Sequence, residues 1–234
     1  MNIRIKALFI MVVVAGWLSC KKNNDAPTVL TTAQLNLVNA SSNTINFYLN
    51  GTRLNNTTSF YPGGSLGYVF NVASGTQNYQ FKIAGNENIL FTKPLTLDSG
   101  KKYSLYISGQ TADNAFMTND VLTADTAGNA LVRFVNASPD SSPLVVAFEG
   151  GSTATTILDT IKFSSVAYKT TTDFIKVKGG FSHNVSVYQA SSSSNPKRDT
   201  TVILNSGQIY TIYSYGLVGT VGNQALNTSL IVNQ

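Results

Sequence analysis

The sequence contains one nucleophile motif, Gly63-Gly64-Ser65-Leu66-Gly67, which fits the Gly-x-Ser-x-Gly pattern around the catalytic serine of α/β-hydrolases. The single histidine, His183, follows this motif in the chain order that such a triad requires. That chemistry needs a strand–turn–helix in a mainly parallel α/β fold, and no helical pattern follows Ser65. We therefore interpret the motif as a turn that opens a strand and His183 as a partly exposed residue at a strand edge. No catalytic residue is expected.

Metal, cofactor and nucleic-acid chemistry also lack a sequence pattern. Nine of the 11 acidic residues are scattered from Asp98 to Asp199, with no calcium loop and no carboxylate pair suited to glycoside hydrolysis. One cysteine and one histidine cannot form a zinc cluster. Basic pairs such as Lys101-Lys102 form no stripe interleaved with aromatic residues, so a nucleic-acid partner is not expected. The sequence predicts no metal and no cofactor.

The only cysteine, Cys20, ends an apolar segment near the N-terminus. Arg4 and Lys6 precede an uncharged apolar run of 12 residues, 7–18. A membrane-spanning helix needs about 20 such residues, so this run is typical of a secretory signal peptide instead. Ser19-Cys20 at its end resembles the lipobox of bacterial lipoproteins, with Trp17 and Leu18 where leucine and a small residue are usual.

This resemblance implies that residues 1–19 are a signal peptide and that residues 20–32 form a lipidated tether. Cys20 would carry the acyl chains, palmitate among them, and two or three chains anchor a protein stably in a membrane. The alternative is an ordinary signal peptide followed by an incidental cysteine. Lys21 directly after the cysteine resembles the sorting preference for the outer membrane. We expect a lipid-anchored protein of the bacterial cell envelope, most simply at the outer membrane, on either face.

Alternating apolar residues indicate β-strands throughout the rest of the chain. The clearest stripes lie in 45–49, 66–72, 79–83 and 103–107, and turn signals such as Asn50-Gly51 and Pro62-Gly63-Gly64 separate them. Such alternation places one face of a strand on a core and the other in water, which is typical of antiparallel sheets. Short strands at this spacing favour an all-β fold of the β-sandwich type.

The second half of the chain repeats motifs of the first half. Leu37-Val38-Asn39-Ala40-Ser41 returns at 134–138, and the Leu-x-Ser-Gly segment at 97–100 returns at 204–207. Each Leu-x-Ser-Gly segment precedes a tyrosine, Tyr103 or Tyr210, expected to be a core aromatic with its hydroxyl bonded to the backbone. The asparagine motifs are expected to form turns. We predict one sandwich domain over 33–125 and a second over 130–234.

The run Val132 to Asp140 and the later Leu-x-Ser-Gly-x-x-Tyr-x-x-Tyr pattern carry a family resemblance. They are similar to the domain of unknown function 4397 family, which occurs in bacterial envelope proteins, often in tandem behind a lipoprotein signal. The resemblance implies two immunoglobulin- or transthyretin-like β-sandwich domains without established activity. Members commonly have histidine where Asn39 and Asn136 stand, so imidazole chemistry is not expected at these positions.

The composition is compatible with binding of a partner protein or a glycan. Charged residues make up 12% of the chain, about half the usual fraction, and neutral polar residues are abundant. Outward tyrosines among them could stack on sugars; the candidates are Tyr48, Tyr61, Tyr106 and Tyr188. The only tryptophan lies in the expected signal peptide, which weakens that interpretation. Two functions stay open: a structural or protein-interaction role in the envelope, and glycan binding.

Overall fold

The computed structural model describes residues 31–55, 59–123, 128–150, 159–191 and 198–233. The expected signal peptide, the expected lipid-attachment residue Cys20 and most of the tether lie outside these residues, as does most of the joint between the repeats. Residues 31–234 form one compact unit.

Four β-sheets account for this unit. Sheet A contains, in order, β4 (Gly64–Ser65), β1 (Thr32–Asn39), β8 (Lys102–Ile107) and β9 (Ala115–Asn119), with β5 (Phe70–Ala73) also paired to β1. Sheet B contains β3 (Thr52–Arg53), β2 (Ile45–Leu49), β6 (Gly75–Ile83) and β7 (Phe91–Leu97). Sheet C contains β13 (Ile175–Lys178), β10 (Asn129–Asn136), β16 (Ile209–Tyr215) and β17 (Asn227–Val232). Sheet D contains β12 (Asp159–Val166), β11 (Leu144–Gly150), β14 (Phe181–Gln189) and β15 (Arg198–Leu204).

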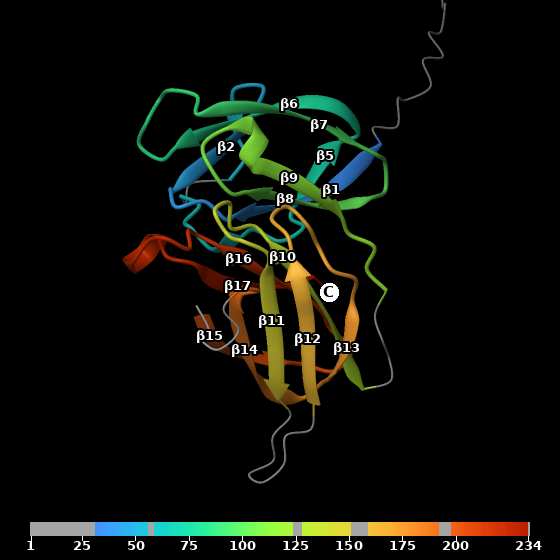
Figure 1. Cartoon of the computed structure of the whole chain (residues 1–234). Coiled ribbons are helices and arrows are strands. Elements are labelled where there is room, and N and C mark those ends of the chain that lie inside the picture. Colours follow the sequence, from blue (N-terminus) through green and yellow to red (C-terminus); the bar gives the residue numbers. More distant parts are fainter. Residues whose placement is uncertain (1–30, 56–58, 124–127, 151–158, 192–197, 234) are drawn as a thin grey trace, which may run out of the picture. The chain divides into compact units, whose positions relative to one another are not determined.

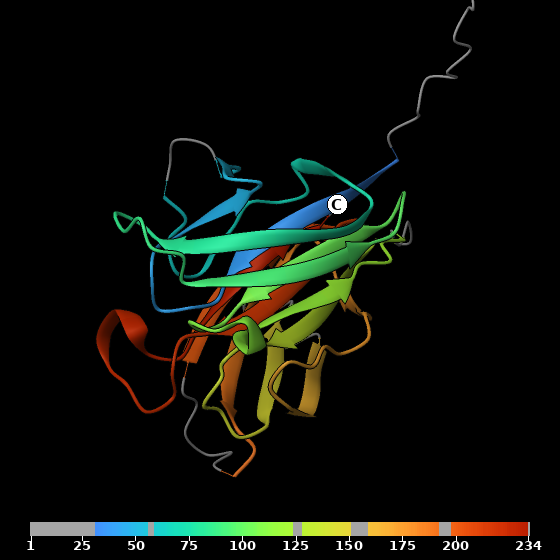
Figure 2. The same ribbon diagram turned by 90° about the horizontal axis from the view of Figure 1, so that it is seen from above.

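Sheets A and B form the first sandwich, and sheets C and D form the second (Figure 1). Two short 3-10 helices, η2 (Ala112–Asn114) and η3 (Gly222–Gln224), are the helical elements of the described residues. Figure 2 shows β6 of sheet B crossing over β1 of sheet A. The expected all-β fold with sandwich packing is confirmed.

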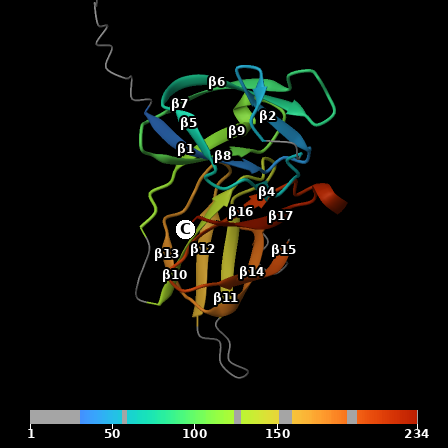
Figure 3. The ribbon, with the colours of Figure 1, turned by 180° about the vertical axis from the view of Figure 1, so that it is seen from behind.

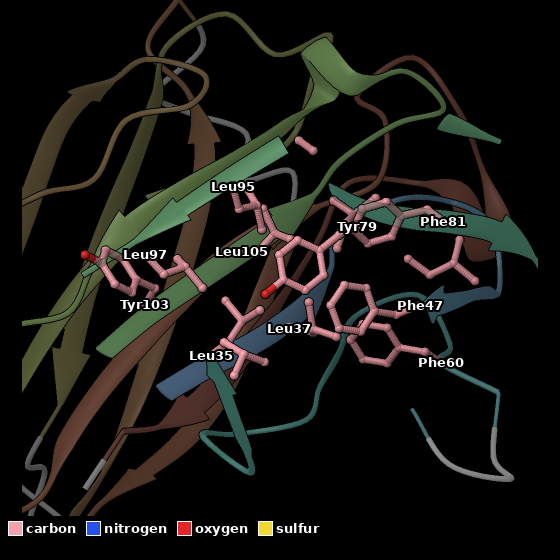
Figure 4. Close-up of a cluster of buried hydrophobic side chains, with 14 of the residues drawn as sticks. Leu35, Leu37, Phe47, Phe60, Tyr79, Phe81, Leu95, Leu97, Tyr103 and Leu105 are labelled. Atoms are coloured by element: carbon pink, nitrogen blue, oxygen red, sulfur yellow. The ribbon is translucent and has the colours of Figure 1, made fainter. Parts of the chain in front are cut away.

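The core of the first sandwich is rich in aromatic rings (Figure 4). Phe47 stacks on Tyr79 with ring centroids 5.2 Å apart, and Phe81 stacks on Phe91 at 4.7 Å. The Tyr79 ring points toward Leu35 and leaves its hydroxyl buried without a partner. Burial raises the pKa of Tyr79 to about 12, because the charged phenolate would lose its hydration there.

The expectation of purely antiparallel pairing is wrong for one strand pair in each sandwich. β1 pairs with β8 in parallel, and β10 pairs with β16 in parallel. In both cases the chain leaves the first strand of the pair and contributes strands to the facing sheet, to its own sheet and to the facing sheet again. It then returns to its own sheet as the parallel partner strand. This crossover is a long-range feature that alternation within a single strand does not report.

The predicted strand over 66–72 is interrupted. The pairing of β4 with β1 ends at Ser65 and resumes only at Phe70 in β5. Gly67 lies between them with φ of +69°, a backbone conformation that ends extended structure. Tyr68 therefore follows a bend and turns toward the second sandwich, where its hydroxyl accepts a hydrogen bond from the Asn233 amide at 3.1 Å.

The tyrosines after the two Leu-x-Ser-Gly segments lie as expected. The Tyr103 hydroxyl accepts a hydrogen bond from the backbone N–H of Asp98 at 3.2 Å. The Tyr210 hydroxyl accepts one from the backbone N–H of Asn205 at 2.8 Å. Both rings are buried in the cores of their sandwiches. Each tyrosine thus ties the turn before its strand to the strand itself.

The two sandwiches pack on each other through sheets A and C, and we call this contact the junction. Figures 1 and 3 place β1 and β8 next to β16 and β17. The apolar part of the junction comprises Val38, Ala40, Tyr106, Val135, Ala137, Tyr213 and Ile231. All of these residues except Ile231 form equivalent pairs between the two repeats, as in the self-complementary interface of a twofold dimer. The expectation that the outer face of every sheet meets water is therefore wrong for sheets A and C.

Candidate functional site

A buried ion pair crosses the junction. Arg133 of β10 donates to a carboxylate oxygen of Asp120, which directly follows β9, and both side chains are buried. Asp120 also accepts hydrogen bonds from Tyr68 at 2.6 Å, Ser104 at 2.6 Å and Thr118 at 2.8 Å. Every oxygen of this carboxylate is thus occupied by protein donors. Such saturation indicates a structural role rather than a reactive group.

The ion pair shifts the titration of the groups around it. Burial raises the pKa of Tyr68 above its ordinary value, and the neighbouring Asp120 charge raises it further. Burial by itself lowers the pKa of Arg133, but the charge and hydrogen bond of Asp120, together with the neighbouring Tyr106 and Tyr68, outweigh it and the net shift is upward. Both shifts favour the neutral tyrosine and the charged arginine. Tyr68 therefore stays neutral and Arg133 stays charged over the ordinary pH range.

The two repeats carry equivalent hydrogen-bond chains into the junction. In the first repeat the Asn36 amide donates to Ser104 at 3.1 Å, and Ser104 donates to Asp120. In the second repeat Arg133 donates to Thr211 at 2.9 Å, and Thr211 donates to Asn233 at 2.7 Å. Strand pairing makes Asp120 and Asn233 equivalent, since each directly follows the last pair of its hairpin.

A groove opens at one rim of the junction, and we call it the junction groove. Its volume is about 450 Å³. Its lining comprises Ser42, Thr44, Tyr61 and Pro62 from the first sandwich, and Tyr215, Asn223 and Asn227 from the second. None of these seven side chains carries a charge, and they supply two aromatic rings, hydroxyls and amides. Such a mixture suits a ligand with apolar faces and neutral hydrogen-bonding groups.

The asparagine motifs hold turns in both sandwiches, and that of Asn39 holds the segment that leads into the junction groove. Asn136 is buried; its amide donates to the backbone oxygen of Val166 at 2.9 Å, and its oxygen accepts from the N–H of Ser138 at 3.1 Å. In the first repeat the Asn39 amide donates to the backbone oxygen of Phe60 at 2.7 Å, directly before Tyr61. The interpretation of both motifs as turns held by side chains is confirmed.

Asp140 fixes the loop that carries Asn223. Its carboxylate accepts hydrogen bonds from the backbone N–H groups of Val218 at 2.8 Å and Gly219 at 3.2 Å. At the base of the same loop, the N–H of Gly216 donates to the backbone oxygen of Ala40 at 3.3 Å, across the junction. The loop is therefore anchored to both sandwiches.

The structure gives the Gly-x-Ser-x-Gly motif a packing role. Gly63 has φ of +73°, and a Cβ atom there would lie 2.5 Å from the Tyr215 ring. Its carbonyl accepts a hydrogen bond from the Tyr213 hydroxyl at 2.7 Å. The Ser65 hydroxyl donates to the Asn36 side chain at 2.9 Å. The motif thus lets the second sandwich approach closely.

His183 lies in the other sandwich and is fully buried, so the expectation of a partly exposed edge residue is wrong. β14, which carries it, lies between β11 and β15 in sheet D. Its ring occupies the space beside Gly150, where a Cβ atom would lie 2.1 Å from Nδ1. Nε2 is 2.9 Å from the backbone oxygen of Lys178. Sheet C separates this histidine from Ser65, so the two do not form a catalytic pair.

The four candidate tyrosines differ in exposure, and the expectation that all face outward is wrong for two of them. Tyr61 is 66% exposed in the junction groove. Tyr48 is half-buried, and the Lys82 ammonium lies 4.8 Å from its ring centroid. Tyr106 is 0% exposed because sheet C covers it, and Tyr188 is 8% exposed. Alternation within β8 identifies two faces but not the second sandwich that buries the outer one.

A second hollow, of about 550 Å³, lies on sheet D. It is lined by Glu149, Asn184, Ser186, Asp199, Thr200 and Thr201. Across the described ranges, no three His, Cys, Asp or Glu side chains lie close enough together to hold a metal ion. In the same part of the chain, no helix is both long and apolar enough to span a membrane.

Sequence reasoning missed Asp120, Arg133 and the groove residues of the second repeat. One signal was available for Arg133, which stands between Val132 and Phe134 in an apolar strand. A charge in such a strand must find a buried partner. Nothing in the sequence pairs it with Asp120, because the partner depends on how two sandwiches face each other.

The fold and the groove define a protein of two β-sandwiches joined face to face, with an uncharged groove at their rim. Residues 33–147 match the family described as "Domain of unknown function (DUF4397)". The match covers the first sandwich and extends through β10 into β11. A comparison with curated proteins found no match.

Several solved structures are distantly similar. The Bacillus anthracis TIE protein is 9% identical with a TM-score of 0.25, over 79% of this chain and 34% of that protein. The family CBM26 module of Eubacterium rectale Amy13K, solved with maltoheptaose, is 10% identical with a TM-score of 0.23, over 86% and 96%. A protein described as a cell adhesion protein of Bacteroides ovatus is 12% identical with a TM-score of 0.26, over 86% and 95%. This chain spans about a third of the TIE protein, and such low scores carry no functional argument.

Proposed function

We propose that this protein is a non-catalytic binding protein of the bacterial cell envelope that recognises its partner through the junction groove. The observation that carries the proposal is the groove itself, which takes its walls from both sandwiches and exposes Tyr61 beside neutral polar groups. Asp120 is saturated with protein donors, and Ser65 lies apart from His183. This arrangement favours recognition over catalysis.

The proposed anchor is Cys20. It follows a signal-like apolar run and is the only thiol of the chain, and Lys21 beside it fits retention at the outer membrane. Replacing Cys20 by alanine should abolish incorporation of labelled palmitate and release the exported chain from the membrane fraction. A Cys20→Ala chain that still sediments with membranes and still takes up label would overturn the anchor.

In-cell photo-cross-linking tests the binding role. A photoreactive phenylalanine at position 61 would sit in the junction groove, while the same residue at position 48 would sit in sheet B as a matched control. We expect an adduct of higher mass at position 61 and none at position 48. Equal labelling at both positions, or none at either, would contradict recognition through this groove and leave a purely structural role.

A further inference from the structure

We infer that the ligand of the junction groove is a neutral saccharide, with one sugar ring seated over the Tyr215–Asn227 strand pair beside the exposed Tyr61. This inference rests on the proposed function and names the class of ligand. It follows from a comparison of the two ends of the junction.

At one end of the junction, a tyrosine ring of the second sandwich packs against residues of the first. The Tyr168 hydroxyl lies 2.6 Å from the Ser108 hydroxyl and accepts a hydrogen bond from the Asn114 amide at 3.2 Å. Its ring packs edge-on against Phe116, with centroids 6.2 Å apart. Tyr168 belongs to the second sandwich and the other residues belong to the first. The first sandwich therefore binds the Tyr168 side chain of the second sandwich through one aromatic ring, one hydroxyl and one amide.

The residues at the other end occupy equivalent positions. Tyr106 and Tyr213 are equivalent in the two repeats, so Ser108 corresponds to Tyr215, two residues further along. Tyr215 pairs with Asn227 as Ser108 pairs with Asn114. The position of Tyr168 corresponds to Pro62 at this end, because Lys169 and Gly63 donate to the equivalent residues Asn136 and Asn39, and the smaller Pro62 lines the junction groove. The chain thus provides an amide and an aromatic ring there and leaves space beside them.

The chemistry of the groove selects the class of ligand. A sugar ring offers apolar C–H faces to aromatic side chains and hydroxyls that both donate and accept hydrogen bonds. Tyr61 and Tyr215 supply rings, Asn223 and Asn227 supply amides, and Ser42 and Thr44 supply hydroxyls. No lining residue is charged, so nothing in the groove offsets the loss of hydration of an ionic ligand.

Two-dimensional NMR on the isotope-labelled full chain in detergent tests this inference. The probes are neutral hexasaccharides of glucose and of mannose, with a hexasaccharide of galacturonic acid as the acidic comparison. We expect a neutral probe to shift the side-chain amide signals of Asn223 and Asn227, and the acidic probe to leave them unmoved. Tyr61→Ala should weaken binding about tenfold or more, whereas Tyr48→Ala should leave it unchanged.

The melting temperature of each variant distinguishes a loss of binding from a loss of folding. Tyr61 is largely exposed, so Tyr61→Ala should unfold at the same temperature as the parent chain. If no neutral probe shifts the groove amides, or Tyr61→Ala binds as tightly as the parent, the saccharide inference is wrong. An adduct with a protein at position 61 in cells, together with silent saccharide titrations, would overturn the saccharide inference alone. Absence of both would overturn the proposed binding function as well.

Discussion

Arg133 and Asp120 form an ion pair from opposite sandwiches, buried where sheets A and C meet. At the equivalent positions of the repeats stand Asn36 and Asn233, both buried and neutral. The junction therefore contains one charged pair where exact repetition would give two. A buried pair of this kind forms only when both partners meet, so it favours one arrangement of the sandwiches over alternatives.

Removal of one partner of this pair should destabilise the protein strongly. Asp120→Asn leaves the Arg133 guanidinium buried without a counter-charge, and we expect a loss of about 3–5 kcal/mol in the free energy of unfolding. The double variant Asp120→Asn/Arg133→Asn places neutral residues like those of the equivalent positions at both sites. Urea unfolding should show it to be less destabilised than the sum of the single variants. Strict additivity would contradict direct coupling across the junction.

The equivalent tyrosines of the junction should respond differently to loss of their hydroxyls. The Tyr213 hydroxyl donates to the backbone oxygen of Gly63 across the junction, whereas the Tyr106 hydroxyl is buried without a partner. Tyr213→Phe should therefore lower stability by about 1 kcal/mol, and Tyr106→Phe should be neutral or stabilising. Chemical denaturation of both variants checks this. A larger loss for Tyr106→Phe would contradict the hydrogen-bond assignment.

Gly150→Ala should be strongly destabilising although the residue ends a strand. The new Cβ would lie 2.1 Å from Nδ1 of His183, which is fully buried and has little room to move. We expect a loss of about 1–3 kcal/mol from overpacking. Adding His183→Ala should recover part of that loss, because it removes the ring that clashes. If the double variant is less stable than Gly150→Ala, the clash is not the cause.

Stability should fall at alkaline pH because tyrosines are buried. Burial raises the pKa of Tyr79 from 10.0 to about 12, and it raises those of Tyr106 and Tyr213 as well. The neutral forms are favoured in the folded state. The contribution of these tyrosines to the free energy of unfolding is therefore fully present below pH 10 and is lost as pH rises toward 12. Linkage gives about 1.4 kcal/mol per pH unit for each such tyrosine across that window.

Near-ultraviolet absorbance of tyrosinate, recorded with circular dichroism, measures this effect. Tyr79, Tyr106 and Tyr213 should ionise only together with unfolding, because all three are buried. Tyr79→Phe keeps the ring and should make the loss of stability with pH less steep. Ionisation of Tyr79, Tyr106 and Tyr213 near pH 10, with the fold intact, would contradict the effect of their burial.

Residue patterns within single strands and turns were sufficient to predict much of the fold. Alternation at Tyr79 and Phe81 identified a core face, and the tyrosines after each Leu-x-Ser-Gly segment were correctly expected to bond to the backbone. These features depend on residues near one another in the sequence. The sandwich architecture followed from the same short strands and turns.

The junction could not be predicted from such patterns. Tyr106 looks outward within its own strand, and only the second sandwich buries it. Gly67 interrupts a strand that apolar spacing alone predicts as continuous. The groove residues Tyr61 and Asn227 come from different repeats and meet only because the sandwiches pack face to face. Each of these outcomes depends on long-range packing that a window of sequence does not contain.

The central claim is that the two sandwiches form one unit joined by the junction, and scanning calorimetry of the full chain tests it most directly. We predict a single reversible transition whose calorimetric and van't Hoff enthalpies agree, with Asp120→Asn lowering its midpoint without splitting it. Two resolved transitions in the parent chain, or a calorimetric enthalpy near twice the van't Hoff value, would show sandwiches that unfold independently and would contradict the account.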